Sequence, residues 1–445
     1  MWSVNNLPRG AHWWASAVLL MLAGCHTPPP CDRNSVSQAV ESRFGHPSSQ
    51  AKTREDILVP QPLANGEPID EDQAVLLALW NNALFREALV ELDLTRADLV
   101  QAGLLPNPEF VYFWPEPNKP FKYLVDFPIE AFWLRPIRIK AMAAENERAC
   151  ARLTQLALDL IRDTRQAYAD LQLAHDRVKV GERAVKLREN ILELAEARLK
   201  AGDASPLEVA TARIDAFQAG QDLTRLRYEV TVMQERLRNF LGLSAYTFPL
   251  VPDNALAESS VAGSVEELVG EAIHTRPDAL AAERAAQAAA ERMRIAKLGW
   301  VRFLGILDAT SGRVTGHEFG PGLRMTVPIF NRNQGGIARA EAEHEQLDHR
   351  RQTIQNQIVL DVRQSHARFE QARAELDYLR RKTRPEVEGA IRRAETAYKE
   401  GNVTYLIVLE LNRQLIDTYT REALLYADLR RAWAELERSV GKRLK

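Results

Sequence analysis

The sequence contains an internal duplication. Residues 196–242 align without a gap on residues 395–441 at a constant offset of 199, and residues 70–108 align on residues 264–302 at an offset of 194. Each half lacks a partner for its own apolar stripe, so the repeat predicts one body built from two interlocked halves. Identities are few, and the register at the offset of 199 rests on Gly202 with Gly401, Leu207 with Leu406, Val209 with Val408, and Gly242 with Gly441.

Each half repeats one order of predicted elements: a helix, two short strands, a very long helix, a tight turn and a return helix. Apolar residues in the long helices recur at spacings of three, four and seven, which is typical of a coiled-coil seam. Pro385 predicts a kink or break in the second long helix, because proline cannot donate to the helix ladder. The expected elements are a helix over 70–105, strands near 109–115 and 121–128, helices over 137–200 and 205–242, strands near 302–310 and 319–328, and a helix over 337–400.

Charge and motif content exclude several classes of function. The chain carries 58 Lys and Arg against 60 Asp and Glu, so nothing predicts a nucleic acid as a partner. The segment from His344 to His349 superficially resembles a zinc-protease helix, but Asp348 stands where the second histidine ligand would have to lie. No Cys or His cluster has metal-ligand spacing. We therefore predict a protein that is not an enzyme and has no cofactor or resident metal.

The first 24 residues read as a processing signal. Arg9 precedes an apolar run over 13–22 that is too short to span a bilayer, and the sequence LAGC follows at 22–25. This tetrapeptide resembles a bacterial lipobox, which implies cleavage before Cys25 and acylation of its thiol. An Asp after the cysteine is the usual signal for inner-membrane retention, so His26 implies an anchor in the outer membrane.

The segment after the signal is rich in proline. Residues 26–69 show little periodicity, so we expect an extended tether between Cys25 and a folded body that begins near Asp70. The other two cysteines are Cys31 in this tether and Cys150 in a predicted helix. We therefore do not expect a structural disulfide, although the periplasm would permit one.

The predicted strands are the only segments suited to crossing a membrane. After Cys25 no segment has the roughly 18 consecutive apolar residues of a membrane-spanning helix. Four strands cannot close a membrane barrel, because open edges would leave unpaired amides in hydrocarbon, so two or three subunits would have to share one. Aromatic residues at the strands could supply an interfacial girdle or, alternatively, fill a soluble core: Phe110, Tyr112, Phe113, Trp114, Phe132, Trp133, Trp300 and Phe303.

The lipobox, the duplicated layout, the two turns and the segment VPIFNRNQG at 327–335 together resemble the TolC type of outer-membrane efflux protein over roughly residues 70–441. The resemblance implies a mainly α fold with a small β part. Duplicated long antiparallel helical hairpins form an α-barrel, and four strands per chain join a trimeric twelve-stranded outer-membrane β-barrel. The sequence FNRNQG at 330–335 is most similar to the heavy-metal branch of the family. The corresponding segment of the first half, FPIEAFWLRP at 127–136, departs from that pattern.

This resemblance divides the chain into five parts. They are a signal peptide over 1–24, an acylated cysteine and tether over 25–69, a first repeat over 70–242, a linker over 243–263 and a second repeat over 264–441. The β-hairpins of the repeats are expected at 109–128 and 302–328, and the tips of their long helical hairpins at 200–205 and 399–404.

Both tips follow one template, in which glycine supplies a left-handed residue and Ser or Thr caps the next helix. The resemblance implies that these tips meet a periplasmic adaptor protein, with Gly202, Ser205, Gly401 and Thr404 as contact residues. It also implies a gate carboxylate at Glu410 and another at Glu208. Like charges in a narrow pore raise one another's pKa and attract cations. The counterpart of Glu208 in the second repeat is the apolar Ile407, and an ordinary exposed glutamate is the alternative for Glu410.

The function implied is a passive exit duct across the periplasm and outer membrane of a Gram-negative bacterium. The homotrimer would work with a periplasmic adaptor and an inner-membrane pump of the RND type, with heavy-metal cations as one candidate cargo. One alternative is the exit duct of a drug or protein exporter. An alternative of another class is a lipid-anchored periplasmic coiled-coil scaffold without a pore.

Overall fold

The computed structural model describes residues 30–47, 57–116, 121–253, 263–312 and 316–444. The predicted signal segment and Cys25 lie outside the described residues. The chain divides into two compact units. Unit 1 comprises Met1–Asp32, Val90–Ala151 and Leu280–Thr353, and unit 2 comprises Arg33–Leu89, Arg152–Ala279 and Ile354–Lys445.

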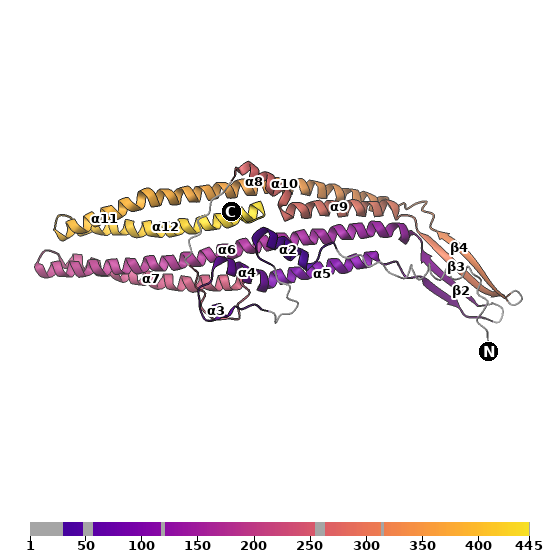
Figure 1. Cartoon of the computed structure of the whole chain (residues 1–445), viewed down its shortest axis with the longest axis horizontal. Coiled ribbons are helices and arrows are strands. Elements are labelled where there is room, and N and C mark those ends of the chain that lie inside the picture. The colour runs from indigo at the N-terminus through magenta and orange to yellow at the C-terminus, as the bar shows by residue number, and fades with distance from the viewer. Residues whose placement is uncertain (1–29, 48–56, 117–120, 254–262, 313–315, 445) are drawn as a thin grey trace. The chain divides into compact units, whose positions relative to one another are not determined.

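The order of elements follows the duplication in the sequence (Figure 1). Each half has two consecutive helices, a pair of strands, a long helical stretch and a return helix. The first half contains α4 (Glu71–Asn81), α5 (Ala83–Gly103), β1 (Glu109–Phe113), β2 (Lys122–Pro128), α6 (Glu130–Ala201) and α7 (Pro206–Phe240). The second half contains α8 (Val265–Thr275), α9 (Pro277–Leu298), β3 (Phe303–Gly312), β4 (Gly316–Met325), α10 (Gln334–Tyr378), a π-helix η1 (Leu379–Thr383), α11 (Arg384–Lys399) and α12 (Tyr405–Val440).

Proline has a different effect on the helix in each of the two long helical stretches. In the second, α10 gives way to the π-helical turn of η1 immediately before Pro385, which confirms the predicted break. In the first, α6 starts at Glu130 instead of 137 and carries Pro136 inside it. Pro136 lies in the second turn, where its missing N–H removes a single bond from a helix of 72 residues.

The helix pairs of unit 2 start at equivalent caps. Asp70 and Ser264 are related by the offset of 194, and each forms a capping box, with Gln73 and Glu267 respectively. In such a box the cap side chain and the third helical residue satisfy one another's backbone amides. The duplication therefore preserves the cap geometry while the residues that form it change.

In both halves, an equivalent hydrogen bond joins the end of the return helix to the preceding helix pair. Asn82, between α4 and α5, donates to the carbonyl of Phe240 at 3.1 Å, and Arg276, between α8 and α9, donates to the carbonyl of Ser439 at 3.2 Å. Both donors are related by the offset of 194 and both acceptors by 199. Each bond ties the end of a return helix to the break in the preceding helix pair.

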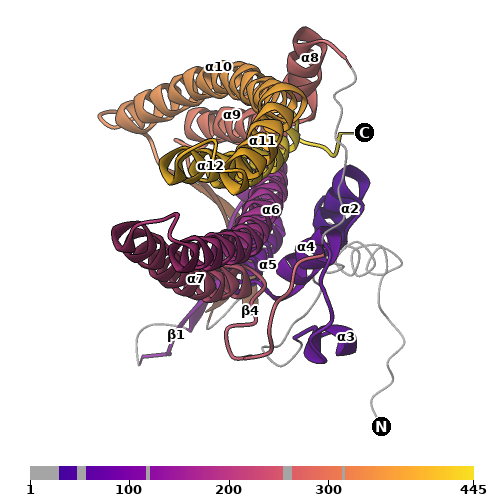
Figure 2. The ribbon, with the colours of Figure 1, turned by 90° about the vertical axis from the view of Figure 1, so that its left-hand side faces the viewer.

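The helical hairpins of unit 2 pack through small and branched apolar residues. Ala195 of α6 packs against Val209 and Ala212 of α7. In the second hairpin, Leu376 and Leu379 pack against Leu425 of α12. Figure 2 shows α7 beside α6 and α12 beside α11. These contacts are the coiled-coil seams that the apolar spacing predicts.

Part of the predicted tether is helical. Helix α2 (Arg33–Phe44) buries Val36, Val40 and Phe44. The prediction of an extended tether over 26–69 is wrong for this segment. Its three apolar residues, spaced by four, form one buried stripe. A pattern this short, flanked by many prolines, did not indicate a helix in the sequence.

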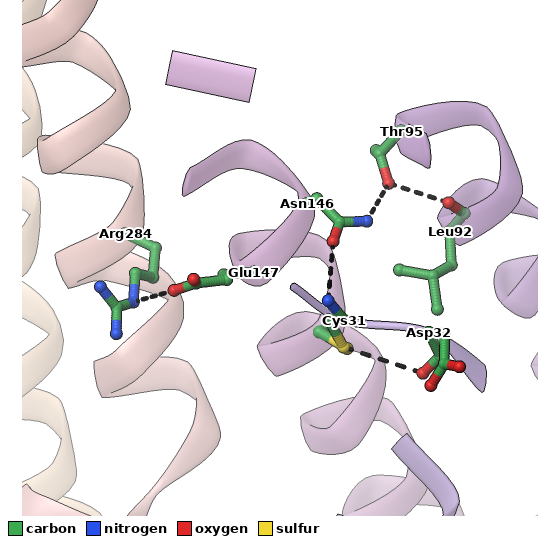
Figure 3. Close-up of a disulfide and its surroundings, with 8 residues drawn as sticks. Cys31, Asp32, Leu92, Thr95, Asn146, Glu147 and Arg284 are labelled. Atoms are coloured by element: carbon green, nitrogen blue, oxygen red, sulfur yellow. Dashed lines mark hydrogen bonds and ion pairs between the residues drawn. A yellow bond between two sulfur atoms is a disulfide. The ribbon is translucent and has the colours of Figure 1, made fainter. Parts of the chain in front are cut away.

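The prediction about cysteine pairing is also wrong. In unit 1, Cys31 and Cys150 form a disulfide, with Cα atoms 6.4 Å apart (Figure 3). The backbone N–H of Cys31 donates to Oδ1 of the fully buried Asn146, one turn before Cys150 on α6. Because this bond docks the N-terminal segment on the helix, Cys31 reaches a partner that an extended tether would not meet.

Candidate functional site

The four strands form one antiparallel sheet in unit 1, in the order β1-β2-β3-β4. The central pairing joins the two halves of the chain, since β2 pairs with β3 from Lys122 opposite Thr310 to Pro128 opposite Leu304. Strands β1 and β4 are the edges, and each pairs on one side only among the described residues. A free edge offers a row of backbone donors and acceptors to another chain.

One face of this sheet is apolar throughout its central rows. Directly paired residues of an antiparallel sheet point to the same face, and successive residues alternate between faces. The register therefore places these residues on one face: Phe110, Tyr112, Tyr123, Val125, Phe127, Phe303, Gly305, Leu307, Ala309, Phe319, Pro321, Leu323 and Met325. Several of them are open to solvent in the single chain, including Phe110 at 65%, Phe319 at 64% and Leu323 at 63%. Along β4, Leu323 and Met325 on this face alternate with Gly322 and Arg324 on the other.

The opposite face carries the charges. Nζ of Lys122 lies 2.7 Å from a carboxylate oxygen of Asp308, and Nη1 of Arg324 lies 3.1 Å from a carboxylate oxygen of Asp126. Glu109 falls on the same face by the strand alternation. This opposite face is mixed, because Leu124, Leu304 and Ile306 lie on it beside the charges. A sheet with one wholly apolar face and one face that carries charges suits a boundary between water and an apolar medium.

The predicted girdle aromatics do not share one position. Phe110 and Tyr112 belong to the apolar face, whereas Phe113 falls on the other face by alternation. Trp114 lies just beyond β1 and is 80% exposed. Trp133 and Phe303 contact each other edge to face, with ring centres 5.6 Å apart.

The hairpin tips carry the predicted glycine geometry. Gly202 has φ of 86° and Gly401 has φ of 78°, the left-handed region that favours glycine. Ser205 caps α7 by accepting from the amide of Glu208 at 3.1 Å. Thr404 has an extended cap backbone before α12 but makes no side-chain cap bond, so the prediction of a Thr cap is wrong.

Glu208 belongs to a cluster that joins the two hairpins within unit 2. The hydroxyl of Tyr398 on α11 donates to Oε1 of Glu208 on α7 at 2.7 Å. The guanidinium of Arg198 on α6 lies 4.5 Å from the ring centre of Tyr398, and its Nη1 lies 3.9 Å from the same carboxylate oxygen. Burial and the bond to Glu208 raise the pKa of Tyr398 above its usual value. The first and second hairpin are thus tied together beside their tips.

The structure does not bring the two predicted gate carboxylates into one cluster. Glu410 is exposed on α12 and accepts a hydrogen bond from Nε2 of Gln414 at 3.3 Å. The sequence analysis missed Tyr398 and Arg198. Tyr398 aligns with Leu199 at the offset of 199. The hydroxyl at a position that is apolar in the first repeat could have indicated that Tyr398 makes a polar contact.

None of the helices in the described residues is both long and apolar enough to cross a membrane. The same residues contain no group of three or more His, Cys, Asp or Glu side chains that could hold a metal ion.

Comparison with known families identifies the chain. The model of the family described as "Outer membrane efflux protein" matches residues 125–243 and 268–442, which is more than half of the sequence. The chain belongs to the outer membrane efflux protein family. The two matched segments of this outer membrane efflux protein correspond to its two halves and include β3, β4 and the end of β2.

Individual relatives of this outer membrane efflux protein are distant. It is 24% identical to the cobalt-zinc-cadmium resistance protein CzcC of Cupriavidus metallidurans over 413 residues, covering 88% of this chain and 95% of CzcC. It is 26% identical to the cation efflux system protein CusC of Escherichia coli over 286 residues, covering 60% of each. It is also 26% identical to the pyoverdine export outer membrane protein OpmQ of Pseudomonas putida over 324 residues, covering 70% of this chain and 68% of OpmQ.

The fold is shared with a solved relative. A crystal structure of CusC superposes with a TM-score of 0.72 at 18% identity, covering 84% of this chain and 92% of that chain. The predicted TolC-like arrangement, mainly helical with a small sheet, is therefore confirmed as the fold of this outer membrane efflux protein.

Proposed function

We propose that this protein is the outer-membrane channel component of a tripartite efflux system, a passive duct that exports heavy-metal cations. The observation that carries the proposal is the sheet: its apolar face is largely exposed, and among the described residues its edge strands β1 and β4 each pair on one side only. Three copies would pair these edges into a twelve-stranded barrel, with the apolar face toward lipid and the Lys122–Asp308 and Arg324–Asp126 pairs toward water.

The cargo follows from the relatives. CzcC is named for resistance to cobalt, zinc and cadmium, and this chain aligns with 95% of the length of CzcC. A duct need not hold its ion, so a metal cargo requires no ligand cluster in the chain. OpmQ, named for pyoverdine export, supports a second candidate, the duct of a small-molecule exporter. Deleting the gene and testing sensitivity to metals, dyes and antibiotics separates the two.

An anchor and partners complete the proposal. Cys25 would carry the lipid that holds the mature N-terminus in the outer membrane. The tips at Gly202, Ser205, Gly401 and Thr404 would meet a periplasmic adaptor, which would connect the duct to an inner-membrane RND pump. Gly202 and Gly401 are exposed, with nothing within 4 Å of a Cβ built on either, so both tips are open to a partner.

The channel is tested by conductance in planar bilayers, with a matched pair of sheet variants. Leu323→Asp places a charge on the apolar face, whereas Thr310→Asp places the same charge on the opposite face. We expect detergent-stable trimers and single-channel currents from the wild-type protein and from Thr310→Asp, and failure of Leu323→Asp to insert. A wild-type protein that is monomeric in mild detergent and gives no current would favour the scaffold without a pore.

The gate is proposed at Glu208 and Glu410. Three copies of each would encircle one axis, where carboxylates attract cations. Glu208 is held by Tyr398 and Arg198, whereas Glu410 is exposed, so the two should act differently. Glu410→Ala should change the cation preference of the channel, and an unchanged single-channel record would remove Glu410 from the gate.

A further inference from the structure

Cys31 lies where three segments of unit 1 meet. Its N–H donates to Oδ1 of Asn146 at 3.1 Å, and Nδ2 of Asn146 donates to Oγ1 of Thr95 at 3.1 Å. Oγ1 of Thr95 in turn donates to the carbonyl of Leu92 on α5 at 3.0 Å. Figure 3 shows this chain of bonds beside the disulfide. The buried amide of Asn146 thus connects the N-terminal segment, α5 and α6, and the disulfide locks the same junction covalently.

We propose that the Cys31–Cys150 disulfide is a staple that fastens the lipid-bearing N-terminus to α6, and that a periplasmic thiol–disulfide oxidase forms it after Cys25 is acylated. The inference rests on the lipid anchor proposed at Cys25. It assigns to this chain a redox partner and a covalent link between its anchor and its body.

Chain length limits where the anchor can lie. Five residues lie between Cys25 and Cys31, and the six Cα-to-Cα steps that join the two cysteines span at most about 21 Å when fully extended. The acylated residue therefore stays within about that distance of Cys31, and hence near the bond to Cys150. Without the bond, Cys31 would be held to α6 by non-covalent contacts, among them the hydrogen bond to Asn146.

Acylation also decides which cysteines can pair. The chain has three cysteines, at 25, 31 and 150, and three thiols allow three different disulfides. A thioether at Cys25 removes two of these and leaves Cys31 with Cys150. Oxidation then joins the two remaining sulfur atoms with loss of two protons and two electrons. The electrons reduce the disulfide of the oxidase to a dithiol by exchange through a mixed disulfide.

Burial protects the finished bond. Cys31 is 7% exposed and Cys150 is 8% exposed. Thiol–disulfide exchange requires access of a thiolate to sulfur, so small reductants should reach this bond only when the segment opens.

Thiol counting on the mature, membrane-extracted wild-type protein tests the pairing. A maleimide polymer should add no label before reduction under denaturing conditions and two labels afterwards. Two labels before reduction would overturn the staple while leaving the lipid anchor intact. One label before and three afterwards would keep the disulfide but overturn its link to an anchor, because Cys25 would then be a free thiol.

Expression in a host that lacks the periplasmic thiol oxidase tests the partner. Two labels should appear before reduction, and cystine added to the medium should restore the oxidised form. An unlabelled protein from that host would overturn the requirement for an oxidase.

Hydrogen exchange tests the fastening itself. In the double variant Cys31→Ser, Cys150→Ser, the amide at position 31 should exchange at least about tenfold faster, because the segment can then open locally. Ala149→Ser places a hydroxyl at a neighbouring buried site on α6 and serves as the control. Equal protection in the double variant and the control would overturn the staple. Should the double variant fail to fold, the same exchange is measured on wild-type protein after reduction with a membrane-permeant phosphine.

Channel conductance is scored separately on the same samples. Wild-type protein that conducts with both thiols free would overturn the staple and leave the proposed function standing. Wild-type protein that carries the disulfide but never conducts would overturn the proposed function and leave the staple standing.

Discussion

Single side chains hold the two hairpins of unit 2 together near their tips. Tyr398 is almost completely buried among Ile191, Ala394 and Val408, yet its hydroxyl reaches Glu208. A hydrogen bond to a charged acceptor contributes about 1.5–3 kcal/mol when its partners are shielded from water. One hydroxyl can therefore bias a movement that separates the tips.

Tyr398→Phe should favour the open tip. The change removes the bond to Glu208 and leaves the carboxylate without this donor, which should shift the balance between closed and open channels by about 1–3 kcal/mol. Single-channel recordings should show a higher open probability. Tyr228→Phe on the exposed surface of α7 is the control and should leave the record unchanged. Equal records for both variants would contradict a role for this bond in closure.

Asp72 should make unit 2 sensitive to acid. Hydrogen bonding from His46, together with Arg443 and Arg165, holds the pKa of Asp72 well below its ordinary value of 3.8. The folded state therefore binds this proton less tightly than the unfolded state, so the stability contributed by Asp72 is present above pH 3.8 and is lost as the pH falls further. Urea unfolding at pH values from about 6 down to 3 should show this loss in the wild-type protein and less of it in Asp72→Asn.

At the scale of elements, glycine and its neighbours shape both tips alike, but the caps differ. Ser205 satisfies an amide at the start of α7. Thr404 makes no such bond at the start of α12. Ser205 and Thr404 are equivalent by the offset of 199. Comparing the two positions therefore measures how much one side-chain cap contributes to the stability of a helix start.

Ser205→Ala should loosen the first turn of α7 by about 1 kcal/mol, the usual contribution of a side-chain cap. Thr404→Ala should change the first turn of α12 by no more than a few tenths of a kcal/mol, because no cap bond is lost. Amide exchange at the start of each helix measures the difference. Equal acceleration at both tips would contradict it.

At the scale of the whole molecule, the disulfide is the one covalent cross-link among the described residues. It closes a loop with a sequence separation of 119 residues. The loop includes α2, α4, α5, β1, β2 and the part of α6 that precedes Cys150. A cross-link of this span restricts the unfolded chain strongly.

Removing the disulfide should lower the free energy of unfolding by about 5 kcal/mol, the loop-closure value for a span of this length. Guanidinium unfolding of the double variant Cys31→Ser, Cys150→Ser should show a lower midpoint than that of wild-type protein. Reductant should lower the midpoint of the wild-type protein and leave that of the double variant unchanged. If the unfolding midpoint of the wild-type protein is the same with and without reductant, the cross-link adds no stability.

Most of the secondary structure could be predicted from the sequence because local signals fix it. Apolar spacing indicates the long helices α6 and α10, Pro385 indicates a kink or break at the start of α11, and glycine indicates the tips at Gly202 and Gly401. Within the site, the sequence singled out Glu208 as a gate carboxylate, a role that stays a prediction. It could not predict that Tyr398 would reach Glu208 across 190 residues, because no local pattern encodes such a contact.

The sequence by itself determined the duplication, the order of helices and strands and the family to which they point, since all of these depend on spacing along the chain. Only the tertiary structure decided that β2 pairs with β3, so that two hairpins become a single sheet with an uninterrupted apolar face. It also decided that Cys31 pairs with Cys150. Both outcomes depend on segments more than 100 residues apart meeting in space, and the packing of the helices between them fixes where those segments lie.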